Sequence, residues 1–281
     1  MHGGTAATGR LWVMPRVLHL TDTHVVAHDT STDPPDSFAS AVAQVQGRTT
    51  GQLLAAVLKA VAAAGVEPDV VLHTGDVTDD GQADSYRRVR DQLAPLGVPV
   101  LIMPGNHDEP TALAATFGHE PAELRWADVG AWRIVTLNTS VRDQDHGILS
   151  PSALAELDTL LAMADRPVLL GLHHPPHSVC LEVACRLQQA PELLEVLGRH
   201  PVVRAVASGH THAADEQDHN GVAFLSSPST CLQLRHDHPL PENNQEPTSI
   251  GARVIDLHDD GTISTALIWA AADDNEERRA G

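Results

Sequence analysis

Short apolar runs recur along this chain, and each is bounded by glycine, proline or polar residues. Runs of about four to eight apolar residues with such borders are typical of strands buried on both faces. They predict strands at residues 17–20, 69–74, 98–102, 133–137, 167–172 and 202–207. Further strands are predicted at residues 222–225, 253–257 and 262–268, so the end of the chain is β-rich.

The segments between these strands carry a helical pattern. Leucine and valine recur at helical spacing between residues 51 and 64, which predicts an amphipathic helix that ends at Gly65. Other helices are predicted at residues 82–93, 110–117, 150–164 and 192–197. The polar, proline-containing segment 28–46 predicts a surface loop. Strands that alternate with helices and then give way to a β-rich end favour an α/β sandwich over a simple doubly wound sheet.

No linker long enough to separate two domains interrupts this pattern. We therefore expect a single domain over residues 14–270, preceded by a tail at 1–13 and followed by a frayed, charged tail at 271–281. A long loop with proline and histidine at 235–247 is a candidate to lie over a functional site.

Polar residues follow five of the predicted strands, and they are of the kinds that bind metal ions. They are Asp22 and His24, Asp76, Asn106 and His107, His173, and His210 and His212. Ligands of open α/β sheets bind outside the carboxyl ends of the strands, so we expect these side chains to meet at one edge. Cations would compensate carboxylates and imidazoles that are buried together there.

Seven of these residues besides His107 are candidate ligands, which suits two ions with one shared ligand. Two ions roughly 3.5–4 Å apart stabilise the attacking and leaving oxygens in phosphoryl displacement. Aspartate, histidine and asparagine without a thiolate favour manganese, iron or zinc in a catalytic site over a structural zinc site.

The charge, the apolar runs and the cysteines of the chain limit which substrates and which cellular location are expected. The formal net charge of −19 would repel the backbone of long nucleic acids, although a small anion can still bind beside metal ions. No run approaches the ~18 apolar residues that a membrane span needs. Three cysteines, Cys180, Cys185 and Cys231, favour thiols in a reducing compartment, and a Cys180–Cys185 bridge stays open. We expect a cytoplasmic protein.

Five ordered blocks give the chain a family resemblance. Asp22-Thr23-His24, Gly75-Asp76, Gly105-Asn106-His107-Asp108, His173 and Gly209-His210-Thr211-His212 resemble the calcineurin-like metallophosphoesterases over roughly residues 15–230. Within that superfamily, residues 103–108, 172–176 and 227–231 look most like the class III bacterial cyclic nucleotide phosphodiesterases. The fold implied is a four-layer αββα sandwich with two mixed β-sheets and the metals at the sheet edge.

The resemblance also implies a role for each matching residue. Asp22, His24, Asp76 and His212 would hold one ion, commonly iron. Asp76 would bridge to a second ion, commonly manganese, held by Asn106, His173 and His210, with zinc as another option. His107 would contact the phosphate and protonate or stabilise the leaving oxygen, while Asp79 orients His107. A homodimer is expected from the resemblance alone.

Two other branches of the superfamily fit less well. Protein serine/threonine phosphatases usually carry arginine before Gly-Asn-His and after the carboxylate matching Asp79, where this chain has Pro104 and Asp80. Purple acid phosphatases supply a tyrosine ligand shortly after Gly-Asp. Tyr86 lies ten residues past Asp76 on a predicted helix, where a packed or surface role is expected.

The hypothesis with most support is a phosphodiesterase that hydrolyses small phosphodiesters, cyclic nucleotides of the cAMP type, by attack of a metal-bound hydroxide. A glycerophosphodiesterase, a nucleotide pyrophosphatase or a broad phosphomonoesterase would use the same site. A non-catalytic metal-binding scaffold is the alternative of another class, and the ligand set together with His107 argues against it. His174 is expected to shape the Pro175-Pro176 turn, and Cys231 to be a small buried residue.

Overall fold

A computed structural model describes residues 14–27, 37–141, 144–177, 186–234, 236, 245–246 and 249–271. Two large sheets dominate it. One contains, in spatial order, β13 (Ile263–Ala271), β12 (Ser249–Leu257), β1 (Arg16–Leu20), β2 (Val70–His73) and β3 (Val100–Ile102). The other contains β4 (Leu124–Val129), β5 (Trp132–Leu137), β6 (Val168–Leu172), β7 (Val203–Ser208), β9 (Val222–Ser226) and β8 (Asp215–His219). A short ribbon pairs β10 (Gln233–Leu234) with β11 (Gln245–Glu246).

Both large sheets are mixed. Strands β1, β2 and β3 run parallel, as do β5, β6, β7 and β9. Antiparallel pairs extend them at β1–β12, β12–β13, β4–β5 and β8–β9. The parallel strands are the ones that carry the polar strand ends of the sequence, so these ends meet at one edge of each sheet.

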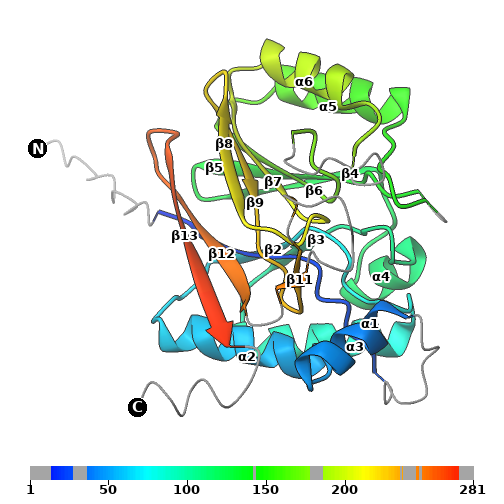
Figure 1. Ribbon diagram of the computed structural model, residues 1–281. Coiled ribbons are helices and arrows are strands. Elements are labelled where there is room, and N and C mark those ends of the chain that lie inside the picture. Colours follow the sequence, from blue (N-terminus) through cyan, green and yellow to red (C-terminus); the bar gives the residue numbers. More distant parts are fainter. Residues whose placement is uncertain are drawn as a thin grey trace, which may run out of the picture.

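Helices cover the outer face of each sheet (Figure 1). They are α1 (Phe38–Gln46), α2 (Thr50–Ala63), α3 (Ala83–Leu93), α4 (Pro110–Phe117), α5 (Pro151–Ala162) and α6 (Ala190–Arg199), with a 3-10 turn at Ala94–Leu96. Helices α2 and α3 pack on the sheet that contains β1, and α5 and α6 pack on the sheet that contains β6. This is the four-layer αββα sandwich that the sequence predicts.

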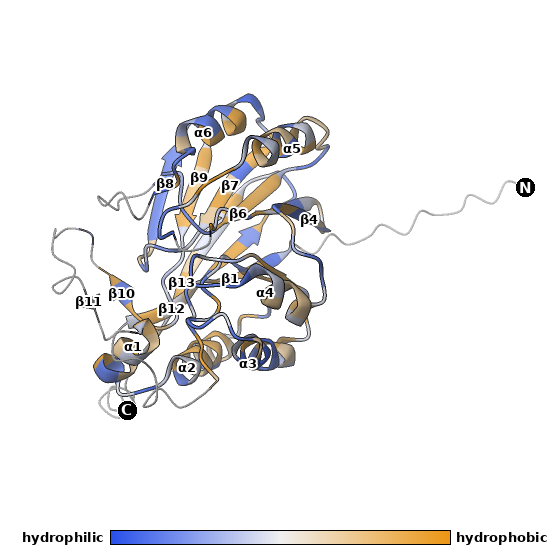
Figure 2. Cartoon of the chain, turned by 90° about the vertical axis from the view of Figure 1, so that its right-hand side faces the viewer, coloured by the Kyte–Doolittle hydropathy of each residue, from blue (hydrophilic) through white to orange (hydrophobic). Residues whose placement is uncertain are grey.

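The central strands of each sheet are buried on both faces, which explains the continuous apolar runs. In β1, Val17 faces the other sheet while Leu18 and Leu20 face the helices. In Figure 2 strands β6, β7 and β9 are hydrophobic, whereas the edge strand β8 is hydrophilic. The interior is therefore made of three apolar layers, one between the sheets and one under each pair of helices.

Several elements differ from the sequence prediction. Residues 38–46 form helix α1, so the expectation of a loop over all of 28–46 was wrong for this part. Ser37 caps α1 by accepting a hydrogen bond from the Ser40 N–H, and Gly47 ends it in the left-handed region. Strands β4 and β8 were also missed because neither has an apolar run: β4 has one buried residue and β8 has none. The two-residue strands β10 and β11 were missed as well.

Several predictions fall outside the described residues. They concern the tail at 1–13, the Cys180–Cys185 pair, all but the first residue of the tail at 271–281, and most of the loop at 235–247. The single-domain boundaries stay a prediction. Within the described ranges, no helix is both long and apolar enough to cross a bilayer.

Candidate active site

The carboxyl ends of β1, β2, β3, β6 and β7 meet at one end of the sandwich, where the two sheets join. Asp22 Oδ2, after β1, accepts a hydrogen bond from the His210 N–H, after β7, at 3.0 Å. His173 Nδ1, after β6, lies 2.7 Å from the Thr74 carbonyl oxygen after β2. The structure thus gathers all the predicted ligands, together with His107, in a single cluster of polar side chains.

The backbone at this edge is unusual. Among the described residues other than glycine, positive φ occurs at Asp22 (50°), His24 (44°), Asp76 (49°), His210 (68°), His212 (49°) and Asn220 (55°). All of these except Asn220 are predicted metal ligands. Left-handed backbone is costly for residues with a Cβ and persists where surrounding structure enforces it, often at functional sites. Here hydrogen bonds hold it, for example from the His24 N–H to the Asp76 carbonyl oxygen at 3.0 Å.

Asp22, His24 and His212 form what we call the closed cluster. Their exposed fractions are 0, 1 and 4 %. His212 Nε2 lies 3.3 Å from His24 Nε2 and 3.4 Å from Asp22 Oδ1. The other ring nitrogens are turned outward, because His212 Nδ1 lies 2.9 Å from the Leu232 carbonyl oxygen and His24 Nδ1 lies 3.3 Å from Asp79.

One outer contact indicates a tautomer. The Leu232 carbonyl oxygen can only accept, so Nδ1 of a neutral His212 carries the hydrogen and its Nε2 presents a lone pair. His24 has a carboxylate oxygen near each ring nitrogen, Asp79 at Nδ1 and Asp76 at Nε2. The Nε2 atoms of both rings and the carboxylate of Asp22 converge away from water, where a cation would compensate the carboxylate and accept ring lone pairs. The donor set of the closed cluster therefore fits a metal ion.

Asn106, His173 and His210 form what we call the open cluster, because Asn106 and His210 are partly exposed. His173 Nε2 lies 3.0 Å from Asn106 Oδ1 and 3.4 Å from Asp76 Oδ2. Burial alone would lower the pKa of His173, but the charge and hydrogen bond of Asp76 outweigh it and raise that pKa to about 9. A fully buried imidazole that favours a positive charge marks a position where negative charge needs a cation.

Asp76 lies between the two clusters. Its Oδ2 atom is 3.5 Å from His24 Nε2 in the closed cluster and 3.4 Å from His173 Nε2 in the open cluster. Its Oδ1 atom accepts a hydrogen bond from the His107 N–H at 3.0 Å. A single carboxylate oxygen within reach of both clusters is the geometry that a shared ligand requires.

His107 lies at the solvent side of the site. Its side chain is 33 % exposed, and its Nδ1 lies 3.0 Å from Asp79 Oδ1. Burial lowers its pKa, but the Asp79 hydrogen bond and the charges of Asp76, Asp79 and Asp108 outweigh burial and raise the pKa to about 9. Asp79 is held in turn by the Ala39 N–H of α1 at 3.0 Å. These contacts are the ones that the roles predicted for His107 and Asp79 need.

His174 lies beside His173 and His210, and its ring offers a third nitrogen within metal-ligand reach. Both of its nitrogens are already engaged, since Nδ1 lies 2.8 Å from Thr139 Oγ1 and Nε2 lies 3.1 Å from the Asp145 carbonyl oxygen. The Thr139 hydroxyl also accepts from the His174 N–H. His174 therefore orders the turn after β6, as the sequence predicts.

Asp108 has a structural task that the sequence pattern does not reveal. Its carboxylate accepts hydrogen bonds from the N–H groups of Gly105, Val77 and Thr78 at 2.8 to 3.1 Å. The Tyr86 hydroxyl donates to it at 3.0 Å, so Tyr86 is a packed residue as expected. Asp108 thus ties the loop after β2 to the loop after β3. A Cβ on Gly105 would overlap Asp76, which explains the glycine.

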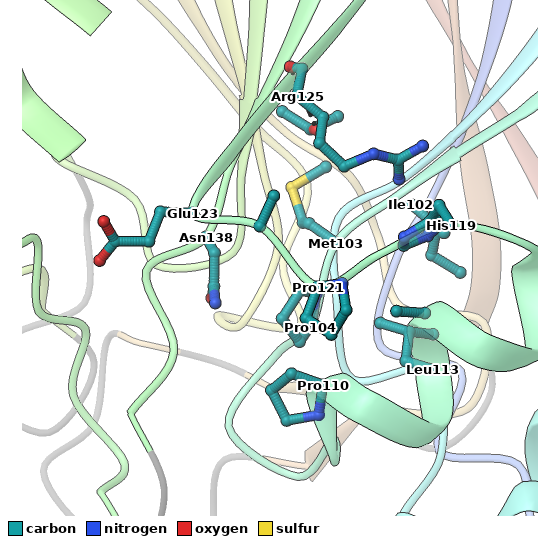
Figure 3. A pocket seen from close by; sticks show the side chains of 13 residues that line it. Ile102, Met103, Pro104, Pro110, Leu113, His119, Pro121, Glu123, Arg125 and Asn138 are labelled. Atoms are coloured by element: carbon teal, nitrogen blue, oxygen red, sulfur yellow. Dashed lines mark hydrogen bonds between the residues drawn. The ribbon is translucent and has the colours of Figure 1, made fainter. Parts of the chain in front are cut away.

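A cavity of about 230 Å³ opens beside Met103 and Pro104 (Figure 3). Its walls are mainly apolar and come from β3, α4, β4 and β5, and Arg125 and Glu123 are its charged residues. None of the predicted ligands lines it, nor does His107. The cavity and the metal-type clusters are therefore different features that share the end of β3.

An αββα sandwich with paired Asp/His clusters at its strand ends defines a metal-dependent phosphoric ester hydrolase. The chain belongs to the calcineurin-like phosphoesterase family, whose model matches residues 15–214. Among solved structures, a dimetal phosphatase from Danio rerio superposes with a TM-score of 0.66 at 15 % identity, covering 92 % of this chain and 97 % of the other. A purple acid phosphatase from yellow lupin gives 0.59 at 15 % identity, covering 93 % of this chain and 52 % of the other. Both likenesses concern the fold.

Other relatives are more similar in sequence. A 3′,5′-cyclic-nucleotide phosphodiesterase of Nostoc sp. is 33 % identical over 256 residues, covering 89 % of this chain and 91 % of that protein. The 3′,5′-cyclic adenosine monophosphate phosphodiesterase CpdA of Escherichia coli K12 is 32 % identical over 264 residues, covering 90 % and 88 %. The resemblance to cyclic nucleotide phosphodiesterases is therefore confirmed.

Proposed function

We propose that this protein hydrolyses small phosphodiesters of the cyclic nucleotide class with two metal ions in the closed and open clusters. The observation that carries the proposal is the position of Asp76, one oxygen of which is within 3.5 Å of a histidine nitrogen in each cluster. The names of the relatives at 32 and 33 % identity support the substrate class.

The residues divide the binding work between the clusters. Asp22, His24 and His212 would hold one ion and Asn106, His173 and His210 the other, with Asp76 shared. Bound there, the ions would neutralise the phosphate and make a water nucleophilic near neutral pH. We propose iron and manganese as the pair, with zinc as the alternative.

His107 would supply the proton that the leaving alkoxide needs. Its side chain is 33 % exposed, the contact with Asp79 fixes its ring, and its raised pKa favours the protonated form near neutral pH. Since Asp79 accepts from Nδ1, the Nε2–H can face the substrate. An oriented, protonated imidazole of this kind is the usual general acid, contributing roughly 10²- to 10⁴-fold.

The test compares metal content and turnover in three preparations. Exhaustive chelation should abolish hydrolysis of bis(p-nitrophenyl) phosphate, and manganese should restore it. His107→Ala should keep the wild-type metal content while turnover falls roughly 10²-fold or more. Asn106→Ala should lose metal and turnover together. Hydrolysis that survives chelation would refute the proposal, and metal loss in His107→Ala would refute the role of His107.

A substrate panel separates the related activities. Turnover of 3′,5′-cAMP, 2′,3′-cAMP, a glycerophosphodiester, a dinucleotide pyrophosphate and p-nitrophenyl phosphate would be compared with manganese present. We expect the cyclic nucleotides to have the highest kcat/KM, and a higher value for any other member would reassign the substrate. A cytoplasmic location and a homodimer complete the proposal, and fractionation and sedimentation test them.

A further inference from the structure

Among the described residues of the candidate site, the predicted ligands and His107 differ in exposure. Asp22, His24, Asp76, His173 and His212 are at most 4 % exposed. Asn106, His107 and His210 are partly exposed. A substrate must therefore approach across the face that these three residues form.

Phe38 borders this face. It is the first residue of α1 and is partly exposed. Its ring centroid lies 4.4 Å from that of His24, 5.2 Å from that of His212 and 6.2 Å from that of His107. Among the described residues, it is the one phenylalanine, tyrosine or tryptophan in ring contact with a predicted site histidine.

Helix α1 holds this ring in place. Ala39, the next residue, is fully buried and its N–H donates to Asp79 Oδ2 at 3.0 Å. Val42 is fully buried in the layer under α2, and Gln46 Nε2 donates to the Cys231 carbonyl oxygen at 3.0 Å. A ring fixed by its helix presents an apolar surface with little further entropy to lose on binding.

We propose that Phe38 determines substrate specificity by contacting the nucleobase of a cyclic nucleotide, which gives the site a preference for diesters that carry an aromatic base. This rests on the proposed function, in which His107 protonates the leaving oxygen. In a cyclic nucleotide the leaving oxygen and the base belong to the same nucleoside, so the base lies on the His107 side of the phosphate. Phe38 is the aromatic surface on that side.

The experiment removes the ring and compares substrates that differ in the base. Phe38→Leu and Phe38→Trp would be assayed with 2′,3′-cAMP and with glycerol 1,2-cyclic phosphate, which has the same five-membered cyclic diester without a base. Because Phe38→Leu removes the aromatic surface on which a base can stack, its KM for 2′,3′-cAMP should be roughly tenfold higher than that of wild type. The KM for glycerol 1,2-cyclic phosphate should stay within about twofold, since the apolar volume is retained. Phe38→Trp should keep the wild-type ratio of the KM for 2′,3′-cAMP to the KM for glycerol 1,2-cyclic phosphate.

Phe117→Leu is the matched control, since Phe117 ends α4 and packs against the layer under α2. It should leave the KM ratio unchanged. Binding provides a readout besides turnover: with manganese present, calorimetry would compare AMP with ribose 5-phosphate, its counterpart without the base. Phe38→Leu should weaken AMP binding roughly tenfold and leave ribose 5-phosphate unaffected.

The outcomes separate this inference from the proposed function. Equal increases in KM for both cyclic diesters, with metal content retained, would show that Phe38 only packs against His24 and would overturn the inference while the function stands. A wild type that cleaves glycerol 1,2-cyclic phosphate but no cyclic nucleotide would overturn the proposed substrate. The comparison of AMP binding with ribose 5-phosphate binding would then decide whether Phe38 recognises a base. Unchanged AMP binding in Phe38→Leu would refute base recognition by Phe38.

Discussion

The closed and open clusters use similar side chains in different surroundings. In the closed cluster His24, His212 and Asp22 are buried, and Phe38 covers the two rings. In the open cluster only His173 is fully buried, while Asn106 and His210 reach solvent. Burial strengthens charge interactions and limits exchange with water. We infer from this difference that an ion in the closed cluster would be the better retained, and that an ion in the open cluster would be the better placed to contact substrate.

Asp76 joins the clusters, so its replacement has the largest expected effect. Asp76→Asn keeps the shape and tolerates left-handed backbone, but it removes the charge that both clusters share. We expect metal content to fall in both clusters and kcat/KM to fall by roughly 10³-fold or more, as for loss of a central electrostatic group. Elemental analysis and steady-state kinetics measure this. Two retained ions per chain would contradict the shared position.

A matched histidine pair tests whether the clusters differ in retention. His210→Asn and His212→Asn each replace one histidine at a left-handed position. In wild type, a chelator should remove metal in a fast phase from the open cluster and a slow phase from the closed one. His210→Asn should eliminate the fast phase and His212→Asn the slow phase, with affinity at the altered position falling at least roughly tenfold. Identical release traces for the two variants would mean the clusters are equivalent.

Asp79 links His107 to the closed cluster, so its removal has an intermediate effect. Asp79→Asn removes the charge of the carboxylate that raises the pKa of His107, and it leaves a weaker, neutral acceptor for Nδ1–H. Because a general acid acts in its protonated form, activity is lost as pH rises through that pKa. The basic limb of the kcat–pH profile should therefore move to lower pH by about one unit. The profile should be measured with a diester whose leaving group is poor, because such a leaving group needs the proton from His107. A basic limb that stays at the wild-type pH would show that Asp79 does not raise the pKa of the general acid.

The smallest expected effect concerns the pH dependence of stability, which depends on two buried histidines beneath the clusters, His19 and His73. Burial lowers the pKa of His19 to about 3 and of His73 to about 4. In the unfolded chain both histidines become protonated below about pH 6.5, whereas in the folded chain they stay neutral. Their contribution to the free energy of unfolding is therefore fully present above about pH 6.5 and is lost as pH falls toward 4. Each contributes a slope of about 1.4 kcal/mol per pH unit within that window.

Urea unfolding between pH 7 and pH 4.5 measures this slope. His19→Gln, whose partner Thr74 Oγ1 lies 2.9 Å from His19 Nε2, should reduce the slope by the contribution of one proton, whatever its effect on stability at pH 7. A slope equal to that of wild type would show that His19 is protonated in the folded state.

The local pattern of the sequence predicted an α/β sandwich and proposed the residues of its site. Apolar runs identified β1, β2, β6 and β7, because strands buried on both faces need nothing from outside the run to be recognised. The polar residues after them identified the edge, because carboxyl ends of parallel strands meet there. The ordered blocks then supported the family, which the match over residues 15–214 confirms.

Only the tertiary structure decided how these residues are arranged. That Asp108 ties two loops together and that both ring nitrogens of His174 have partners depend on contacts between distant segments. Helix α1 was missed because its residues are amphipathic only over a short length and become helical by packing Ala39 and Val42 into the core. The placement of Phe38 against His24 follows from that packing, since no periodicity within the chain specifies contacts across the fold.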